Sequence, residues 1–326
     1  MAEWLFEEGI GEDRAILVED GEILEAAIEL PGPVRAGAVM PARLARILIP
    51  GRRGIAALDA GGEALVEPLP ADLTEGAAFR VEIVREPVPE AGKAKLAKGR
   101  ATDAELRPGA RLSERLGGLM PHSAHGPDRF EQAGWSELLE EAMRGEIDFP
   151  GGALRMSLTP AMILFDVDGS LAPAELAIAG AAAAGRAIRR MGIAGSIGID
   201  LPTLSGRPDR QAAAAALDAV LPQPFERTAV NGFGFLQVVR RRERPSLAEI
   251  VQSDPAGAAA RALMRRAQRL EGHGGMAVHA SPAVIARIEA QPDWLVALER
   301  QAGGAIVLQA EPGLAISAGH VQHRRN

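Results

Sequence analysis

The strongest constraint in this sequence is an alanine-rich helix predicted between two short apolar segments that each lead into aspartate. Ala161–Val167 (AMILFDV) and Gly195–Asp200 (GSIGID) are typical of buried strands. The helix between them is predicted from about Pro173, a proline suited to a first turn, to Arg190, an arginine suited to a last turn. A strand, a helix and a strand in this order form a βαβ unit, whose two strands are parallel and joined by a right-handed crossover. This part of the chain is therefore predicted to be an α/β sheet.

The N-terminal part has a different pattern. Residues 14–30 alternate between apolar and polar side chains on both sides of Asp20-Gly21, which predicts a hairpin. Between Val34 and Glu86 follow four or five short strand-like segments separated by glycine-containing turns. Short strands at this spacing are typical of a small antiparallel barrel, and the length suits an OB-type barrel.

We therefore expect an α/β protein of several domains (α+β in its overall organisation), with an OB-like barrel inserted near the N-terminus. The predicted segments are N-terminal strands packing on the catalytic part (1–33), the barrel (34–100), a linker (101–130), an α/β domain (131–250) and a small C-terminal α/β domain (251–326).

Composition limits the function classes. The formal net charge is −7 and aromatic residues make up 3%, so a nucleic-acid site would have to be local. Cysteine is absent, which excludes disulfides, a thiol nucleophile and cysteine-ligated zinc. The acidic start does not resemble a signal peptide, and no apolar run reaches the roughly 18 residues of a membrane span. We expect a soluble, cytoplasmic protein with no membrane partner.

Three aspartates follow the two predicted strands. Asp166 and Asp168 come at the end of the first strand, and Asp200 ends the second. Parallel neighbours would place all three at one edge of the sheet, where α/β sheets bind ligands. Carboxylate oxygens in this number suit Mg²⁺, or Mn²⁺, better than zinc, and such an ion can activate water and hold a phosphate. The alternative is that each aspartate only caps the turn or helix that follows it.

Two known families offer an interpretation of these residues. Phe165–Leu171 (FDVDGSL) resembles the first motif of the haloacid-dehalogenase phosphatases, in which the first aspartate, here Asp166, is the nucleophile. The lysine that this family has downstream is missing, because no lysine follows Lys98.

The second resemblance covers more of the chain. Arg14–Glu29 is similar to the opening hairpin of the ribonuclease E/G family, and the barrel stands where that family has its OB-fold RNA-binding domain. Glu146–Gly152 with Ile163–Asp168, then Gly195–Asp200, resemble the approach to the catalytic strand and the second catalytic strand. Phe233–Leu247 (FGFLQVVRRRERPSL) resembles the characteristic segment beyond them.

This resemblance implies Mg²⁺-dependent endonucleolytic cleavage of single-stranded RNA, as in RNA processing and decay, leaving a 5′-phosphate. Asp166 and Asp200 correspond to the two metal-binding aspartates, and Asp168 stands where the family has a supporting asparagine. Nearby arginines, Arg240 and Arg242, would hold the RNA backbone.

The basic run Lys93, Lys95 and Lys98 has two interpretations, a solvated linker or a phosphate-contacting rim on the barrel. The family's sensor for RNA 5′ ends and its zinc-link cysteines are absent, so neither 5′-end sensing nor a zinc-linked oligomer is expected. Gly232 stands where the family has arginine, and the barrel has aliphatic residues where the family stacks bases. A non-catalytic RNA-binding relative of the family therefore remains the alternative to the enzyme.

Overall fold

The computed structural model describes residues 1–90, 94–117, 119–121 and 126–324. Lys93, one of the predicted RNA contacts, lies outside this range. The chain forms two compact units, each built from separate stretches of sequence. The first unit comprises Met1–Pro31, Leu116–Met143 and Ile250–Asn326, and the second comprises Gly32–Arg115 and Arg144–Glu249.

The first unit begins with a four-stranded sheet in the order β3-β2-β1-β9. Its strands and the helices that follow are β1 (Glu3–Glu8), β2 (Asp13–Glu19), β3 (Glu22–Glu29), β9 (Met120–Pro121), α2 (Arg129–Gln132) and α3 (Trp135–Arg144). The predicted hairpin at Asp20-Gly21 is present, and both turn residues have positive φ, the conformation that a tight hairpin requires.

The C-terminal part of this unit has a three-stranded sheet in the order β17-β16-β18, packed with helices. Its elements are α7 (Pro255–Gln268), β16 (Met276–Ala280), α8 (Pro282–Glu289), α9 (Pro292–Ala302), β17 (Ile306–Ala310), a short 3-10 turn η1 (Ile316–Ala318) and β18 (His320–His323). Helix α6 (Leu247–Ser253) spans the boundary between the two units.

The second unit contains a closed five-stranded barrel in the order β4-β5-β6-β8-β7. Its strands are β4 (Val39–Ile49), β5 (Arg53–Leu58), β6 (Glu63–Val66), β7 (Ala78–Arg85) and β8 (Ala97–Ala101), followed by α1 (Leu112–Arg115). Strand β8 pairs parallel to β6 and antiparallel to β7, so the end of the predicted barrel segment closes the barrel. The predicted barrel is confirmed in its position and closure, but it is not wholly antiparallel, since β6 and β8 form a parallel pair.

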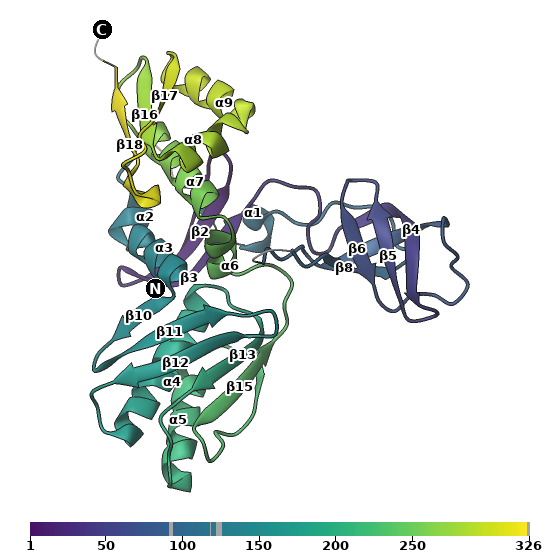
Figure 1. Cartoon of the computed structure of the whole chain (residues 1–326), viewed down its shortest axis with the longest axis vertical. Coiled ribbons are helices and arrows are strands. Elements are labelled where there is room, and N and C mark those ends of the chain that lie inside the picture. Colours follow the sequence, from purple (N-terminus) through teal and green to yellow (C-terminus); the bar gives the residue numbers. More distant parts are fainter. Residues whose placement is uncertain (91–93, 118, 122–125, 325–326) are drawn as a thin grey trace. The chain divides into compact units, whose positions relative to one another are not determined.

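The rest of the second unit is a six-stranded mixed sheet in the order β10-β11-β12-β13-β15-β14 (Figure 1). Its elements are β10 (Glu146–Phe149), β11 (Gly152–Leu158), β12 (Ile163–Gly169), α4 (Pro173–Arg190), β13 (Gly195–Asp200), α5 (Arg207–Val220), β14 (Glu226–Arg227) and β15 (Phe235–Arg240). Strands β12 and β13 are parallel, as the βαβ pattern predicts, and the other pairs in this sheet are antiparallel.

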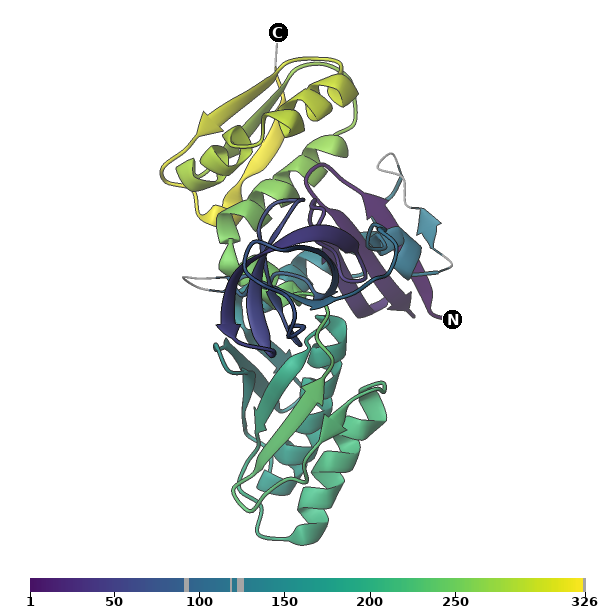
Figure 2. The ribbon, with the colours of Figure 1, turned by 90° about the vertical axis from the view of Figure 1, so that its right-hand side faces the viewer.

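Helices α4 and α5 pack against each other on one face of this sheet, as the teal-to-green part of Figure 2 shows. Phe165 and Val167 of β12 and Ile197 and Ile199 of β13 are buried on the helix side. Since side chains alternate along a strand, Asp166 and Asp200 project from the opposite face. Among the described residues, no helix combines the length and the apolarity that crossing a bilayer requires.

Candidate functional site

The two aspartates that end the parallel strands are direct neighbours. In the pairing of β12 with β13, Ile163 lies beside Ile197, Phe165 beside Ile199, and Asp166 beside Asp200. The burial of alternate residues against the helices fixes this register, because a shift of one residue would turn the apolar side chains to the other face. The sequence-based prediction that the strand ends bring Asp166 and Asp200 together is therefore confirmed as geometry.

Both carboxylates lie on the exposed face of the sheet. Within the part of the chain that the structure describes, neither Asp166 nor Asp200 forms an ion pair. Two like charges on adjacent strands repel each other, and this repulsion is relieved when a cation lies between them. The pair therefore has the charge and the accessibility of a cation site.

Asp168 lies two residues beyond Asp166, on the same face of β12, and it has a cationic neighbour. The Arg155 guanidinium on β11 lies 3.6 Å from the Asp168 carboxylate, and both side chains are mostly exposed. Arg155 is also the register partner of Asp166 across β11 and β12. The structure thus places Asp168 beside the pair but gives it a salt bridge of its own.

Among the described residues, no group of three or more histidine, aspartate or glutamate side chains is arranged to hold a metal ion. A site here would have two carboxylates as its protein ligands. Mg²⁺ tolerates this arrangement, since it keeps several waters and is often bound by one or two carboxylates together with substrate phosphates. The donor set therefore fits Mg²⁺ or Mn²⁺ and does not fit a zinc site with three or four protein ligands.

An exposed aromatic residue lies beside this edge of the sheet. Phe233 is 83% exposed, in the loop that leads into β15, and Phe235 at the start of β15 is the register partner of Asp200. The loop is held in shape because the Asn231 side-chain oxygen accepts hydrogen bonds from the backbone N–H groups of Phe233 (2.9 Å) and Phe235 (3.0 Å).

Gly234 completes the loop with φ +95°, and its carbonyl accepts a hydrogen bond from the N–H of Leu201, the residue after Asp200. A side chain at Gly234 would collide with the Leu201 carbonyl. The sequence resemblance includes Phe233 at the start of a family-like segment but gives its side chain no role. The sequence signal that could have pointed to this exposed ring is a phenylalanine between two glycines in a chain with few aromatic residues.

The strand beside the aspartates also needs a glycine. An added Cβ at Gly198 would lie 2.6 Å from Phe235 Cζ and 2.7 Å from Leu164 Cδ2. The Phe235 ring therefore lies across Gly198, on the same face as the aspartates. This apolar cover borders the carboxylate pair on one side.

The arginines expected near the aspartates lie elsewhere. Arg240 pairs with Gly195, whereas Phe235 pairs with Asp200, so Arg240 is at the opposite end of β15 from the aspartates, on the order of 17 Å along the strand. Its guanidinium donates to the Ile193 carbonyl at 3.0 Å. Arg242 forms an ion pair with Glu249, and burial lowers the pKa of its guanidinium. The expectation that these arginines lie near Asp166 and Asp200 was wrong, because β15 runs antiparallel to β13.

The described lysines of the basic run are paired with acidic residues. Lys95 forms an ion pair with Glu90 and donates to the Pro160 carbonyl at 2.9 Å. Lys98, on the barrel strand β8, lies 3.1 Å from Glu67. Hydrogen bonds from Arg53 and Lys98 lower the pKa of the Glu67 carboxyl, which therefore neutralises part of this run.

Comparison with known proteins adds no assignment: no protein-family model matches the chain, and a search of the curated proteins gives no match either.

Proposed function

We propose that this protein is a metal-dependent endoribonuclease that cleaves single-stranded RNA with Asp166 and Asp200 as its metal-binding carboxylates. The observation that supports this most directly is their direct register pairing on adjacent parallel strands, exposed and without ion-pair partners among the described residues. Two unpaired carboxylates side by side destabilise the folded state, so a purely structural role does not explain them. The same arrangement is suited to binding a divalent cation together with a phosphate.

When bound, Mg²⁺ or Mn²⁺ would polarise the scissile phosphate and lower the pKa of a water molecule. The chain's own residues contribute position and charge. Asp166 and Asp200 supply the ligand oxygens, and Arg155, beside Asp168, supplies a positive charge on the same face. Phe233 offers an exposed ring on which one base of a single strand can stack.

The barrel supports a nucleic-acid substrate in a general way. A five-stranded barrel with non-sequential strand order is compatible with the OB fold, which binds oligonucleotides in other proteins. Together with the resemblance of several sequence blocks to the ribonuclease E/G family, this favours RNA over a small phosphate ester as the substrate.

The proposal is tested with an internally labelled single-stranded RNA, the purified chain, and Mg²⁺ or Mn²⁺. We expect internal cleavage by the wild type and none by the Asp166→Asn/Asp200→Asn double variant. The matched control is Asp148→Asn, which removes a carboxylate from the exposed face at β10, where its register partner is Ala153. This control is expected to cleave normally.

If the wild type binds RNA but cuts it with neither metal, the chain is better described as a non-catalytic RNA-binding protein. Release of phosphate from p-nitrophenyl phosphate that requires Asp166 and not Asp200 would instead support the phosphatase interpretation. Either result would overturn the proposed function.

A further inference from the structure

A pocket of about 510 Å³ lies between α5 and the segment that contains β14. This volume is within the range of pockets that bind small molecules. One wall is a single face of α5, since its residues follow helical spacing, and the other wall is the chain from Arg227 to Val230. The lining residues are Arg207, Arg210, Gln211, Ala214, Ala215, Arg227, Ala229 and Val230.

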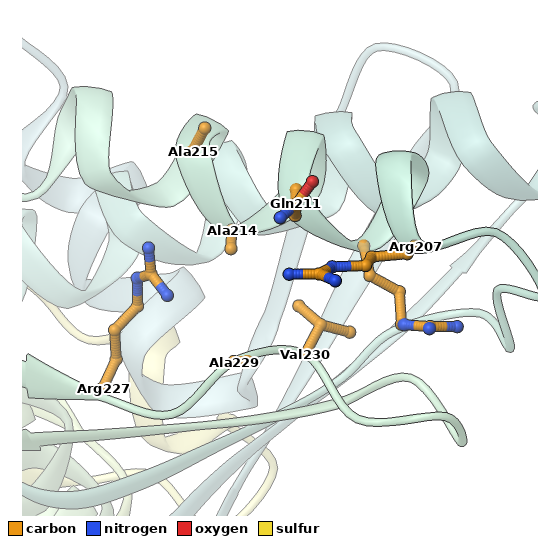
Figure 3. A pocket seen from close by; sticks show the side chains of 8 residues that line it. Arg207, Gln211, Ala214, Ala215, Arg227, Ala229 and Val230 are labelled. Atoms are coloured by element: carbon orange, nitrogen blue, oxygen red, sulfur yellow. The ribbon is translucent and has the colours of Figure 1, made fainter.

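The pocket is cationic although the chain as a whole is acidic. Three of the eight lining residues are arginines and none is acidic, whereas the formal net charge of the chain is −7. Figure 3 shows Arg207 and Arg227 at opposite ends of the hollow, with Gln211 and Ala214 projecting from α5 and Val230 facing them. The polar groups of the pocket therefore frame an apolar centre.

Arg227 is already neutralised and fixed. Its Nε lies 2.6 Å from Asp218 Oδ1, its Nη2 contacts Asp218 Oδ2, and its Nη1 donates to the Thr228 carbonyl at 3.0 Å. The hydrogen bonds that Arg227 donates to the Asp218 carboxylate raise the pKa of the Arg227 guanidinium. Arg227 thus forms one wall, and the unbalanced positive charge belongs to the other two arginines.

Arg210 is held in place by the loop before α5. Its Nη1 donates to the carbonyls of Leu204 (2.7 Å) and Ser205 (3.2 Å). This leaves the remaining guanidinium N–H groups in a fixed orientation. Such preorganisation lowers the entropic cost of binding an anion.

Arg207 stands three residues earlier on the same helical face and is exposed, and Gln211 follows Arg210. Among the residues that the structure describes, no carboxylate forms an ion pair with Arg207 or Arg210. Two guanidinium groups and one amide at this spacing provide the planar donors that phosphate oxygens accept bidentately.

The centre of the pocket suits a flat apolar group. Ala214, Ala229 and Val230 are small or branched, so the space between the helix and the strand segment is not filled by side chains. We propose that this pocket binds a terminal phosphate monoester of mononucleotide size, with the phosphate on Arg207, Arg210 and Gln211 and the base over the apolar floor. The pocket lies on the α5 side of the sheet, opposite the face of Asp166 and Asp200, so the two sites are separate.

The test is isothermal titration with adenosine 5′-monophosphate and with adenosine, in EDTA so that no divalent cation contributes. We expect the phosphate form to bind the wild type about tenfold or more tightly than adenosine, since only the phosphate accepts charge-assisted hydrogen bonds from Arg207 and Arg210. Arg207→Ala/Arg210→Ala should lose this preference. Arg186→Ala, which removes an exposed arginine from α4, is the control and should keep it.

A second variant tests the volume rather than the charge. Ala229→Phe places a ring in the pocket at an exposed position and should weaken adenosine 5′-monophosphate binding without changing the unfolding temperature. The Asp166→Asn/Asp200→Asn variant should bind the nucleotide like the wild type. Failure of the proposed nuclease activity would therefore leave this result unaffected.

RNA decamers with a 5′-phosphate and with a 5′-hydroxyl distinguish the two sources of the monoester. A preference for the phosphorylated decamer that requires Arg207 and Arg210 identifies RNA ends as the ligand, and its absence beside tight nucleotide binding identifies free nucleotides. Equal binding of adenosine and its 5′-monophosphate, or an undiminished preference in the Arg207→Ala/Arg210→Ala variant, would overturn the proposal.

Discussion

Asp166 and Asp200 occupy paired positions on adjacent parallel strands, and both project from the face of the sheet that α4 and α5 leave uncovered. The surrounding sheet explains why they are held there. Apolar residues on either side of each aspartate are buried against the helices, so the strands cannot rotate to separate the charges. The fold therefore holds two like charges side by side, an arrangement that a bound cation would relieve.

The first prediction concerns stability. Without divalent cations, Asp200→Asn should raise the free energy of unfolding by about 0.2–1 kcal/mol, because it removes like-charge repulsion between neighbouring strands. Adding Mg²⁺ should raise the unfolding temperature of the wild type and leave that of Asp200→Asn unchanged. Thermal unfolding followed by circular dichroism, with and without Mg²⁺, measures both effects. Asp148→Asn should behave like the wild type, and a Mg²⁺ response in Asp200→Asn would contradict the assignment.

The second prediction rests on the proposed RNA substrate. Phe233→Ala should weaken binding of single-stranded RNA by about 1–3 kcal/mol, the usual contribution of one base stacked on an aromatic ring. The free energy of unfolding should stay the same, since the ring is 83% exposed. Fluorescence anisotropy of a labelled RNA in EDTA separates binding from cleavage. Val296→Ala, which truncates another exposed apolar side chain, is the control, and equal losses in both variants would exclude stacking at Phe233.

Local patterns were enough to predict the elements that now form the site. Apolar strands, a proline-initiated helix and the Asp20-Gly21 turn are encoded within short windows, and β12, α4, β13 and the first hairpin follow them closely. The apolar periodicity between residues 130 and 144 does not show that the segment forms two helices, α2 and α3, which are divided where Gly134 adopts φ +91°. A glycine inside a periodic segment does not reveal by itself whether the helix continues through it.

Long-range pairing could not be predicted in the same way. The direction of β15 relative to β13 decides that Phe235 lies beside Asp200 and that Arg240 lies at the far end. No local feature of Phe235–Arg240 specifies this direction, because an alternating strand fits either orientation. The arginine pocket could not be predicted for a similar reason, since Arg207 and Arg227 are twenty residues apart in sequence and line one pocket only because α5 packs beside the segment with β14.

The third prediction tests the close approach of α4 to β12, the strand that carries Asp166. A Cβ added at Gly180 would collide with the Val167 side chain, one residue from Asp166. Gly180→Ala should lower the free energy of unfolding by about 1–3 kcal/mol, although alanine is the better helix former. In Gly180→Ala/Val167→Ala the smaller strand residue makes room for the added methyl group. The double variant should therefore lose less unfolding free energy than the sum of the losses in the two single variants. Far-UV circular dichroism in urea is the measurement, because all three tryptophans (Trp4, Trp135 and Trp294) belong to the first unit.

The fourth prediction concerns pH. Hydrogen bonding from Arg227 lowers the pKa of the Asp218 carboxyl below its usual 3.8, so the folded state releases this proton more readily than the unfolded state. The contribution of the Asp218–Arg227 pair to the free energy of unfolding is present above pH 3.8 and is lost as the pH falls through the lowered pKa. Asp218→Asn should therefore lower the free energy of unfolding by less than about 1 kcal/mol at pH 7, since the pair is partly exposed. In acid the effect of this substitution should become progressively smaller. Urea unfolding at pH 7 and pH 3 measures this difference, and Glu226→Gln, a nearby exposed carboxylate, should show no such trend.

The fifth prediction concerns a buried charge in the first unit. Arg14 is 1% exposed, and its Nε donates to Glu7 at 2.6 Å while its guanidinium lies 4.1 Å from the centre of the Phe130 ring. Burial, followed by repulsion from Arg265, lowers the pKa of Arg14 to about 10. Glu7 has a second partner, since Arg269 donates to its other oxygen at 2.7 Å. Arg14 also has a second anionic neighbour, but its Nη2 lies 3.7 Å from Asp128 Oδ1, so Glu7 is its closest partner.

Glu7→Gln should lower the free energy of unfolding by about 3–5 kcal/mol, because it leaves the Arg14 charge buried without its principal partner. Arg14→Met should lower the free energy of unfolding by less, since Glu7 keeps its contact with Arg269 and the methionine can pack against Phe130. The double variant should be more stable than Glu7→Gln alone, because no unpaired cation remains at position 14. Tryptophan fluorescence during urea unfolding reports on this unit directly, as Trp135 packs edge-on against Phe130 at 5.7 Å. A double variant as unstable as the sum of the single variants would show that Arg14 and Glu7 act independently, contrary to the geometry of their contact.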